Sequence, residues 1–197
     1  MKFSRVWAMP NKWTYTIKPI KELLEREIGG YSIDLFCGNS DLCTWNNDIQ
    51  DTDGAFLNHD AIDFLNCHGD CEVDTVLFDP PYSPRQVSEC YKKVGKTVNQ
   101  LTTSARFWSQ LKNKTAKITT LGGKVISFGW NSNGMGINRG FEIEEILIVA
   151  HGGNHNDTIV TVERKIKNMM EENTPSWRDN PIAFGYCDVE ILEVIKN

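Results

Sequence analysis

The stretch VLFDPPYSPRQ, residues 76–86, joins an apolar run to an aspartate, two prolines and a tyrosine. Together with the residues before it, the apolar run predicts a buried strand over residues 73–78. Proline has no backbone N–H group and a fixed φ angle, so the two prolines end the strand and hold the next residues rigidly. The turn either only ends the strand or presents Asp79, a free carbonyl and Tyr82 in one geometry.

Predicted strands and helices alternate on both sides of this stretch. We expect helices over residues 18–28, 61–67, 85–95 and 104–121, and strands over residues 31–38, 43–48, 73–78, 124–130, 143–151 and 157–165. The last helix is expected to end at Gly122-Gly123, and the turn-rich GGNHN between the last two strands is typical of a hairpin. This order predicts an open α/β sheet, mainly parallel, with an antiparallel hairpin at its C-terminal edge.

The size and composition of the chain fit one globular domain. It has 197 residues, of which 40% are apolar and 24% are charged. No run approaches the roughly 18 apolar residues of a membrane span, and the first residues, MKFSRVWAMPNKW, lack the apolar core of a signal peptide. We therefore expect a cytoplasmic protein without a membrane partner. Residues 168–197 depart from the alternation. We expect them to form a C-terminal extension, which either packs on the domain of residues 1–167 or forms a separate recognition element.

The net charge of −5 argues against a protein that coats nucleic acid, although it allows a local basic surface that binds nucleic acid. Lysines and arginines cluster within residues 92–96, 112–117 and 164–167. Each cluster is either a solvated face of a helix or strand or part of such a binding surface.

The cysteines and histidines do not predict a metal site. A chain of this length buries its own core without disulfides, and the CHGDC pair at residues 67–71 has no second pair nearby to complete a zinc site. His151 and His155 lie in the predicted hairpin turn without an acidic third ligand in register. We expect six free thiols and no metal.

In open parallel sheets, ligands bind beyond the carboxyl ends of the strands. In DLFCGNS, residues 34–40, Gly38 permits a close backbone approach, and Asp34 with the loop amides suits a polar ligand; an ordinary strand-to-helix turn has the same pattern. Asp48, which ends TWNND, is placed to accept hydrogen bonds from ribose hydroxyls. Asp60 in NHDAIDF either reaches an adenine amino group or caps the next helix.

The DPPY turn is suited to activating an exocyclic amino group of a nucleobase. The lone pair of such a nitrogen is delocalised into the ring, so the nitrogen is a poor nucleophile until it is drawn toward tetrahedral geometry. Asp79 and the Pro80 carbonyl offer two acceptors for its two N–H bonds, and Tyr82 offers a flat face for stacking, worth about 1–3 kcal/mol in single-strand binders. The arrangement would stabilise positive charge as it develops on the nitrogen.

These motifs resemble the DPPY-type S-adenosylmethionine-dependent amino-methyltransferases of DNA, especially the compact adenine-N6 enzymes that phages carry. KPIKELL resembles the helix before the cofactor loop of this family, DLFCGNS its cofactor motif, and DPPYSPRQ its catalytic motif. The resemblance covers roughly residues 9–165 and implies a Rossmann-like class I methyltransferase fold with S-adenosylmethionine as the cofactor. Ser40 stands where a second glycine is usual in the family.

The resemblance implies a role for each site residue. The catalytic residues would be Asp79, Pro80, Pro81 and Tyr82. The cofactor would contact Pro10, Lys18, Asp34, Phe36, Gly38, Asp48, Asp60, Ala61 and Asp79. Nucleic acid would contact Arg85, Asn131, Asn133 and Arg139, although the loop that holds the last three is equally well an ordinary surface loop. The implied reaction is methylation of the adenine amino group in DNA after the base is flipped out of the duplex. Cytosine-N4, an RNA base, or a catalytically degenerate module that only binds cofactor or nucleic acid are the alternatives.

Overall fold

The computed structural model describes residues 1–69, 71–98 and 104–168, so the predicted extension lies outside the described residues from position 169 onward. The helices are α1 (Lys18–Glu27), α2 (Ala61–Cys67), α3 (Pro84–Lys93) and α4 (Ala105–Ile118), with 3-10 turns η1 (Thr14–Thr16) and η2 (Ile137–Arg139). The strands are β1 (Lys2–Trp7), β2 (Ser32–Asp34), β3 (Trp45–Asn46), β4 (Val73–Phe78), β5 (Thr119–Gly129), β6 (Phe141–Ala150) and β7 (Thr158–Lys165).

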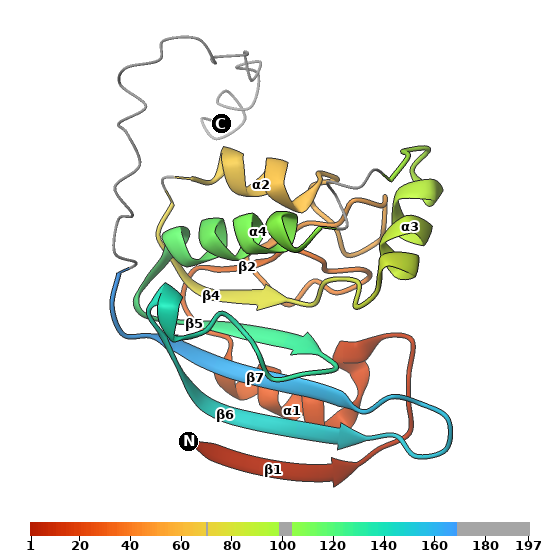
Figure 1. The fold of residues 1–197 in the computed structure, drawn as a ribbon, viewed down its shortest axis with the longest axis vertical. Coiled ribbons are helices and arrows are strands. Elements are labelled where there is room, and N and C mark those ends of the chain that lie inside the picture. The colour runs from red at the N-terminus through yellow and green to blue at the C-terminus, as the bar shows by residue number, and fades with distance from the viewer. Residues whose placement is uncertain (70, 99–103, 169–197) are drawn as a thin grey trace, which may run out of the picture.

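The seven strands form one sheet in the order β1-β6-β7-β5-β4-β2-β3 (Figure 1). Within the described part of the chain, β7 alone runs antiparallel to its neighbours, so the predicted open, mainly parallel α/β sheet is confirmed. The antiparallel strand does not lie at the edge, however. It lies between β5 and β6, because the β6–β7 hairpin folds back and inserts its second strand beside β5.

The edge next to β6 is formed by β1, which the sequence did not predict as a strand. It pairs with β6 in parallel, from Lys2 opposite Glu145 to Trp7 opposite Ala150. Phe3 and Trp7 remain 61% and 65% exposed. Five of the six residues of this edge strand are exposed, so its apolar residues give neither an alternating nor a buried pattern, which explains why the strand was missed.

The boundary between α4 and β5 also differs from the prediction. α4 ends at Ile118, and β5 begins directly at Thr119, so Gly122-Gly123 lies inside the strand and does not end the helix. The pairing of β4 with β5 shifts here, from Val73 opposite Thr119 to Thr75 opposite Lys124. Gly122 has a φ angle of +83°, and a Cβ atom on Gly123 would lie 2.7 Å from the Thr120 hydroxyl. The glycines therefore allow an irregularity in the strand.

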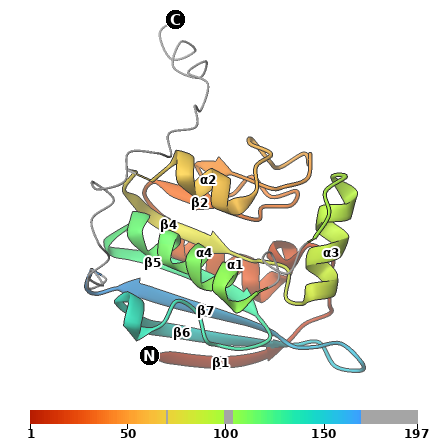
Figure 2. The same ribbon diagram turned by 45° about the horizontal axis from the view of Figure 1, so that its top comes forward.

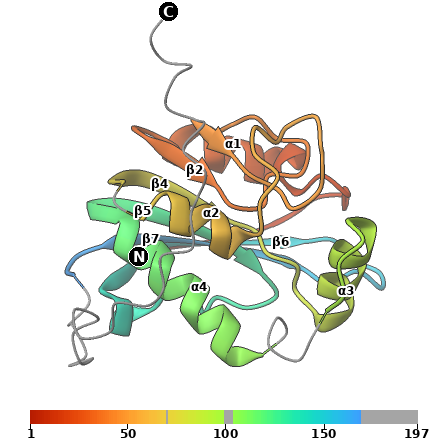
Figure 3. The same ribbon diagram turned by 90° about the horizontal axis from the view of Figure 1, so that it is seen from above.

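Helices cover both faces of the sheet (Figure 3). On one face, α1 packs its buried Ile20, Leu23 and Leu24 against alternate residues of the central strands, among them Leu77 and Ile126. On the other face, α2 and α4 pack against the intervening residues. Both cores include residues near the carboxyl ends of the central strands. Close packing of these residues fixes the positions at which the following loops begin.

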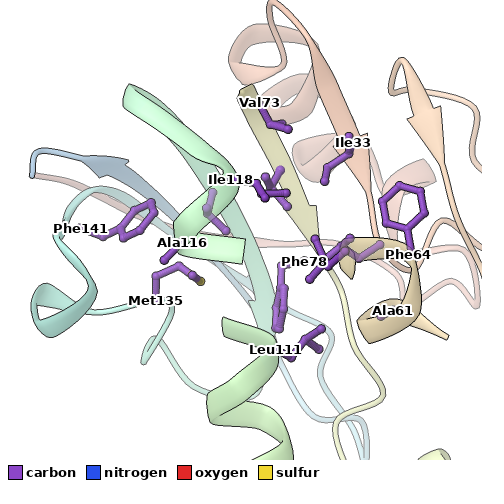
Figure 4. Close-up of a cluster of buried hydrophobic side chains, with 14 residues drawn as sticks. Ile33, Ala61, Phe64, Val73, Phe78, Leu111, Ala116, Ile118, Met135 and Phe141 are labelled. Carbon is purple, nitrogen blue, oxygen red and sulfur yellow. The ribbon is translucent and has the colours of Figure 1, made fainter. Parts of the chain in front are cut away.

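Phe78 of β4 and Leu111 of α4 lie side by side in the second core (Figure 4). Leu111 is fully buried, and removing such a side chain from water contributes about 1.5–3 kcal/mol. This contact fixes the middle of α4 over the end of β4, where the DPPY turn begins.

The helix after the DPPY turn, α3, stands beyond the carboxyl ends of the strands rather than against either face (Figures 1 and 2). Ser83 caps it by accepting a hydrogen bond from the Gln86 amide at 3.3 Å, and Pro84 occupies its first turn. Only Val87 of this helix is buried. No helix within the described residues is long and apolar enough to cross a membrane.

Candidate active site

A cleft of about 420 Å³ opens at the carboxyl edge of the sheet, between the strand ends, α2, α3 and the start of α4. Eight of the predicted site residues line it together: Phe36, Asp48, Asp60, Ala61, Asp79, Pro80, Pro81 and Tyr82. They come from the ends of β2, β3 and β4 and from the start of α2. The structure therefore brings the four predicted catalytic residues and five of the nine predicted cofactor residues to one place.

The DPPY turn is held by hydrogen bonds within its own segment. The Tyr82 hydroxyl donates to Asp79 Oδ1, and the Tyr82 amide donates to Gln86 Oε1 at 2.8 Å. Within the described residues, the Pro80 carbonyl accepts no hydrogen bond. The turn thus presents one carboxylate and one free carbonyl, and Gln86, which the sequence analysis missed, is the residue that holds its backbone.

The environment of Asp79 disfavours negative charge. Burial raises the pKa of Asp79 to about 6, and hydrogen bonds from Tyr82 and Thr14 act against this rise. Asp79 forms no ion pair with any described residue. At neutral pH the group is mainly a carboxylate, but its charge is compensated by hydroxyl donors alone.

The Tyr82 ring is partly open to the cleft and meets Trp130 edge to face, with ring centroids 5.6 Å apart. Trp130 directly follows β5 and is 45% exposed. Tyr82 thus lines the cleft, and Trp130 packs against the ring of Tyr82.

Asp34 lies beneath the cleft, not in its wall. It is fully buried, and burial raises its pKa to about 8. Asp34 Oδ1 accepts a hydrogen bond from the Phe36 amide at 2.9 Å. Its other oxygen and the buried Tyr15 hydroxyl form no hydrogen bond of regular geometry with a described residue. The Tyr15 hydroxyl nevertheless acts as a donor that counters the rise in the pKa of Asp34, so the two groups are near neighbours in the buried floor of the site.

Asp48 joins the loops that follow β2 and β3. Its Oδ2 accepts from the Gly38 amide at 3.0 Å and its Oδ1 accepts from the Gln50 amide at 2.8 Å. Gly38 has a φ angle of +53°, a conformation that favours glycine. Each carboxylate oxygen retains a lone pair that a ligand hydroxyl could use. Asp48 is thus both a structural acceptor and a wall of the cleft.

Ser40, in place of the usual glycine, fits the loop without strain. Its amide donates to the Cys37 carbonyl at 2.9 Å, and among the described residues no residue other than glycine has a positive φ angle. Close approach is provided by a different glycine, since a Cβ atom on Gly54 would lie 2.4 Å from the Asn39 backbone. The loop therefore keeps its compact shape with serine at this position.

Asp60 is the N-cap of α2, where its Oδ1 accepts from the Ile62 amide at 3.1 Å. Its Oδ2 accepts from the Tyr91 hydroxyl of α3. The helix-cap interpretation is confirmed, and Asp60 also lines the cleft. The bond between Asp60 and Tyr91 joins α2 to α3 across the opening.

The remaining predicted cofactor residues do not line the cleft. Gly38 lies behind its wall. Lys18 is exposed at the start of α1, 3.9 Å from Glu22. Pro10 does not line the cleft either, although Lys12, two residues later, does.

The predicted nucleic-acid residues lie outside the cleft as well. Arg85 is exposed and forms an ion pair with Glu89 at 2.8 Å. Arg139 donates to Asn113, Met135 and Ser109 at 2.7–3.0 Å, which fastens η2 to α4. Asn131 and Asn133 bond each other through the Asn131 side chain in the exposed loop after β5. Their roles toward nucleic acid remain predictions.

Several residues of the cleft were not predicted from the sequence. Lys12 and Thr14 come from the segment between β1 and α1, whereas the aromatic residues come from two helices: Tyr91, Phe107 and Trp108. These segments are distant in sequence and meet only through packing. The clearest available signal was FW at residues 107–108, an aromatic pair in the first turn of a helix whose buried residues come later.

The cleft has an acidic floor without cationic partners. None of Asp34, Asp48, Asp60 and Asp79 forms an ion pair with a described lysine, arginine or histidine. The described residues contain no group of His, Cys, Asp and Glu that could hold a metal ion, and five described cysteines are free thiols. The donor set therefore suits an organic ligand that carries positive charge, hydroxyls and N–H groups.

Comparison with known proteins gives only distant likenesses. No protein-family model and no curated protein sequence matches the chain. SMU.776, assigned as a methyltransferase and complexed with SAH, matches with a TM-score of 0.49 and 11% identity, over 72% of this chain and 47% of that chain. TrmN from Thermus thermophilus gives 0.46 and 15%, over 76% and 49%. NSun6 from Pyrococcus horikoshii with SFG gives 0.44 and 15%, over 85% and 48%. The chain spans about half the length of these structures.

Proposed function

We propose that this chain transfers a methyl group from S-adenosylmethionine to the exocyclic amino group of adenine in DNA, with the base flipped into the cleft. The observation that supports this most is the joint presence, in one cleft, of the rigid DPPY acceptors and the acidic strand ends. Neither feature alone would be specific, because each also occurs as ordinary fold structure.

The acidic half of the cleft fits the cofactor. Asp48 has free lone pairs for ribose hydroxyls, and Phe36 and Ala61 offer apolar contact for a base. Asp34, which is mainly protonated at neutral pH, lies buried beneath them. When bound, S-adenosylmethionine supplies an electrophilic methyl carbon on a positively charged sulfonium. An acidic site without internal ion pairs would favour that charge.

The DPPY half of the cleft prepares the nucleophile. Asp79 and the Pro80 carbonyl accept one hydrogen bond each from the two N–H groups of the amino group. These hydrogen bonds draw the nitrogen toward tetrahedral geometry. As the nitrogen–carbon bond forms and the sulfur–carbon bond breaks, positive charge develops on nitrogen beside the Asp79 carboxylate. The extra proton on the methylated nitrogen is then lost to solvent. Orientation and charge stabilisation supply the rate, without a covalent enzyme intermediate.

Tyr82 has two roles in this proposal. Its ring, with Trp130 beside it, stacks on the extruded base. Its hydroxyl holds the Asp79 carboxylate in the orientation needed for the amino group and keeps it ionised. Both roles require the short, proline-fixed connection between the two residues.

The test is transfer of a labelled methyl group from S-adenosylmethionine to unmethylated DNA, followed by analysis of the modified nucleosides. We expect N6-methyladenine in DNA with the parent chain, and loss of the signal in Asp79→Ala with cofactor binding retained. Glu27→Gln, at the opposite edge of the sheet, serves as the control and is expected to keep activity. Label in N4-methylcytosine or in RNA would reassign the target, and no label in DNA or RNA despite cofactor binding would contradict methyl transfer.

A further inference from the structure

Positive charge is concentrated in one segment of this acidic chain. Residues 83–118 contain eight of the 21 lysines and arginines but only one of the 26 aspartates and glutamates. That segment has a net charge of +7, whereas the whole chain has −5. It comprises α3 and α4, the two helices that form the outer wall of the cleft. The acidic strand ends and the basic helices thus face each other across one opening.

Most described cations outside this segment are engaged within the protein. Ion pairs hold Lys2, Arg5, Lys18, Lys21, Arg26, Lys124 and Arg164, and Lys165 donates to backbone carbonyls. Charges that already have partners offer little attraction to a polyanion. The informative cations are the exposed ones that lack a partner.

Four exposed cations of the segment form no ion pair or hydrogen bond through their side chains with any described residue: Lys92, Lys93, Lys96 and Arg106. Three others share this property. Lys12 lines the cleft from the segment before α1 and lies 4.6 Å from the centre of the Trp13 ring. Lys117 and Lys167 lie at the amino ends of the parallel strands, where β5 begins and β7 ends.

The four free cations adjoin the rim of the cleft. Lys93 lines it, and Lys92 is next to Tyr91, whose hydroxyl bonds Asp60 across the opening. Lys96 is tied to the same turn, because its amide donates to the Tyr91 carbonyl at 2.9 Å. Arg106 precedes Phe107 and Trp108, which line the cleft from the first turn of α4.

We infer that Lys92, Lys93, Lys96 and Arg106 form the DNA-docking surface, which binds the phosphates on either side of a base inserted in the cleft. This inference rests on the proposed function and identifies where its substrate lies. It replaces the arginines predicted from the sequence, since Arg85 is paired with Glu89 and Arg139 is bonded to α4 and its own loop. Phosphate contacts of this kind position the nucleic acid and do not read its sequence.

Salt dependence provides a test that does not depend on catalysis. The double variant Lys93→Gln and Lys96→Gln removes two charges at the rim. Its matched control, Lys117→Gln and Lys167→Gln, removes two equally exposed and unpartnered charges at the opposite edge. Binding of an adenine-containing duplex oligonucleotide is measured by fluorescence anisotropy as a function of salt, without S-adenosylmethionine, and unfolding curves verify that both variants are folded.

Two lost phosphate contacts should lower the slope of log affinity against log salt by about 1.8. Between 50 and 200 mM salt, the parent chain would therefore lose about tenfold more affinity than the rim variant, and the control would behave as the parent. A rim variant with the parent's slope, equal changes in rim variant and control, or the same lysine-dependent binding to RNA but not to DNA would overturn the inference.

The outcomes separate this inference from the proposed function. Methyl transfer to DNA with unchanged salt dependence in the rim variant would leave the function and reject the surface. Reduced salt dependence in the rim variant without methyl transfer by the parent would leave the surface and reject the function.

Discussion

The two ends of the parallel strands, here called the amino edge and the carboxyl edge of the sheet, differ in whether their charged side chains form ion pairs. At the amino edge, where the parallel strands begin, acidic and basic side chains alternate in a connected network: Lys2–Glu145 at 2.8 Å, Arg26–Glu145 and Lys124–Glu27 at 2.6 Å, and Arg164–Glu144 at 2.5 Å. At the carboxyl edge, four aspartates lie in or under the cleft, and none of them forms an ion pair with a described residue, although Lys12 and Lys93 line the same cleft.

The pKa values follow this difference. Ion-pair hydrogen bonds from Lys124 and Arg26 outweigh burial and lower the pKa of Glu27, whereas burial raises the pKa of Asp34 to about 8 and that of Asp79 to about 6. Protein charges that neutralise one another stabilise the fold. Buried carboxylates without such partners cost stability and are typical of sites that bind a ligand.

The largest effect is expected from Asp79→Asn. The amide keeps the shape of the side chain but loses the negative charge that would stabilise the developing cation, so methyl transfer should fall about 100- to 1000-fold. In the parent, the rate should rise with pH through about 6, as Asp79 becomes ionised, and this limb should vanish in the variant. Single-turnover kinetics across pH measure both, and a rate within a few-fold of the parent would remove Asp79 from the chemistry.

Asp34→Asn should change how stability depends on pH. The pKa of Asp34 is about 8 in the folded chain and 3.8 as its ordinary value, so the folded state binds the proton more tightly. Its contribution to stability is therefore present at low pH and lost as pH rises from about 4 to about 8. Urea unfolding at pH 5 and pH 8 should show the parent losing at least about 2 kcal/mol relative to the variant, given about 1.4 kcal/mol per pKa unit. A pH-independent difference between the two chains would contradict the buried, uncompensated carboxyl.

Glu27→Gln tests the paired edge. The change removes the ion pairs with Arg26 and Lys124, and because both partners retain access to water we expect a loss of about 1–2 kcal/mol in the free energy of unfolding. The pKa of Glu27 is lowered in the folded chain, so its contribution is present at neutral pH and lost on acidification. Chemical unfolding at neutral and acid pH measures this. A large loss of methyl transfer without loss of stability would contradict the view that the amino edge of the sheet contributes to stability and not to activity.

Tyr82→Phe should give the smallest effect. The variant retains the ring for stacking but loses the hydroxyl that lowers the pKa of Asp79. The acid limb of the pH–rate profile should move upward by up to about one pH unit, while the rate on the plateau stays within a few-fold. An unchanged limb would mean that the hydroxyl does not act on Asp79 during turnover.

Much of the site was predictable because it depends on local chain chemistry. Two prolines after an apolar strand fix Asp79 and Tyr82 within one turn, and Asp60 before an apolar periodic run caps α2. The parallel strands also place their carboxyl ends at one edge, so Phe36, Asp48 and Asp79 were expected to meet. Such features follow from backbone geometry and from the spacing of apolar residues, which any tertiary arrangement of this class must respect.

The sequence by itself determined the alternating α/β elements, the rigid DPPY turn and the excess of positive charge in residues 83–118. Only the tertiary structure decided that β7 lies between β5 and β6, that Thr14, Tyr91 and Trp108 meet at the cleft, and which charges have partners. Strand neighbours form the same backbone hydrogen bonds whatever their order, and contacts between residues far apart in sequence leave no local pattern. Whether a charge is paired therefore depends on which surfaces the fold brings together. In this sheet the charges at the amino ends of the parallel strands are paired, and the aspartates at the carboxyl ends are not.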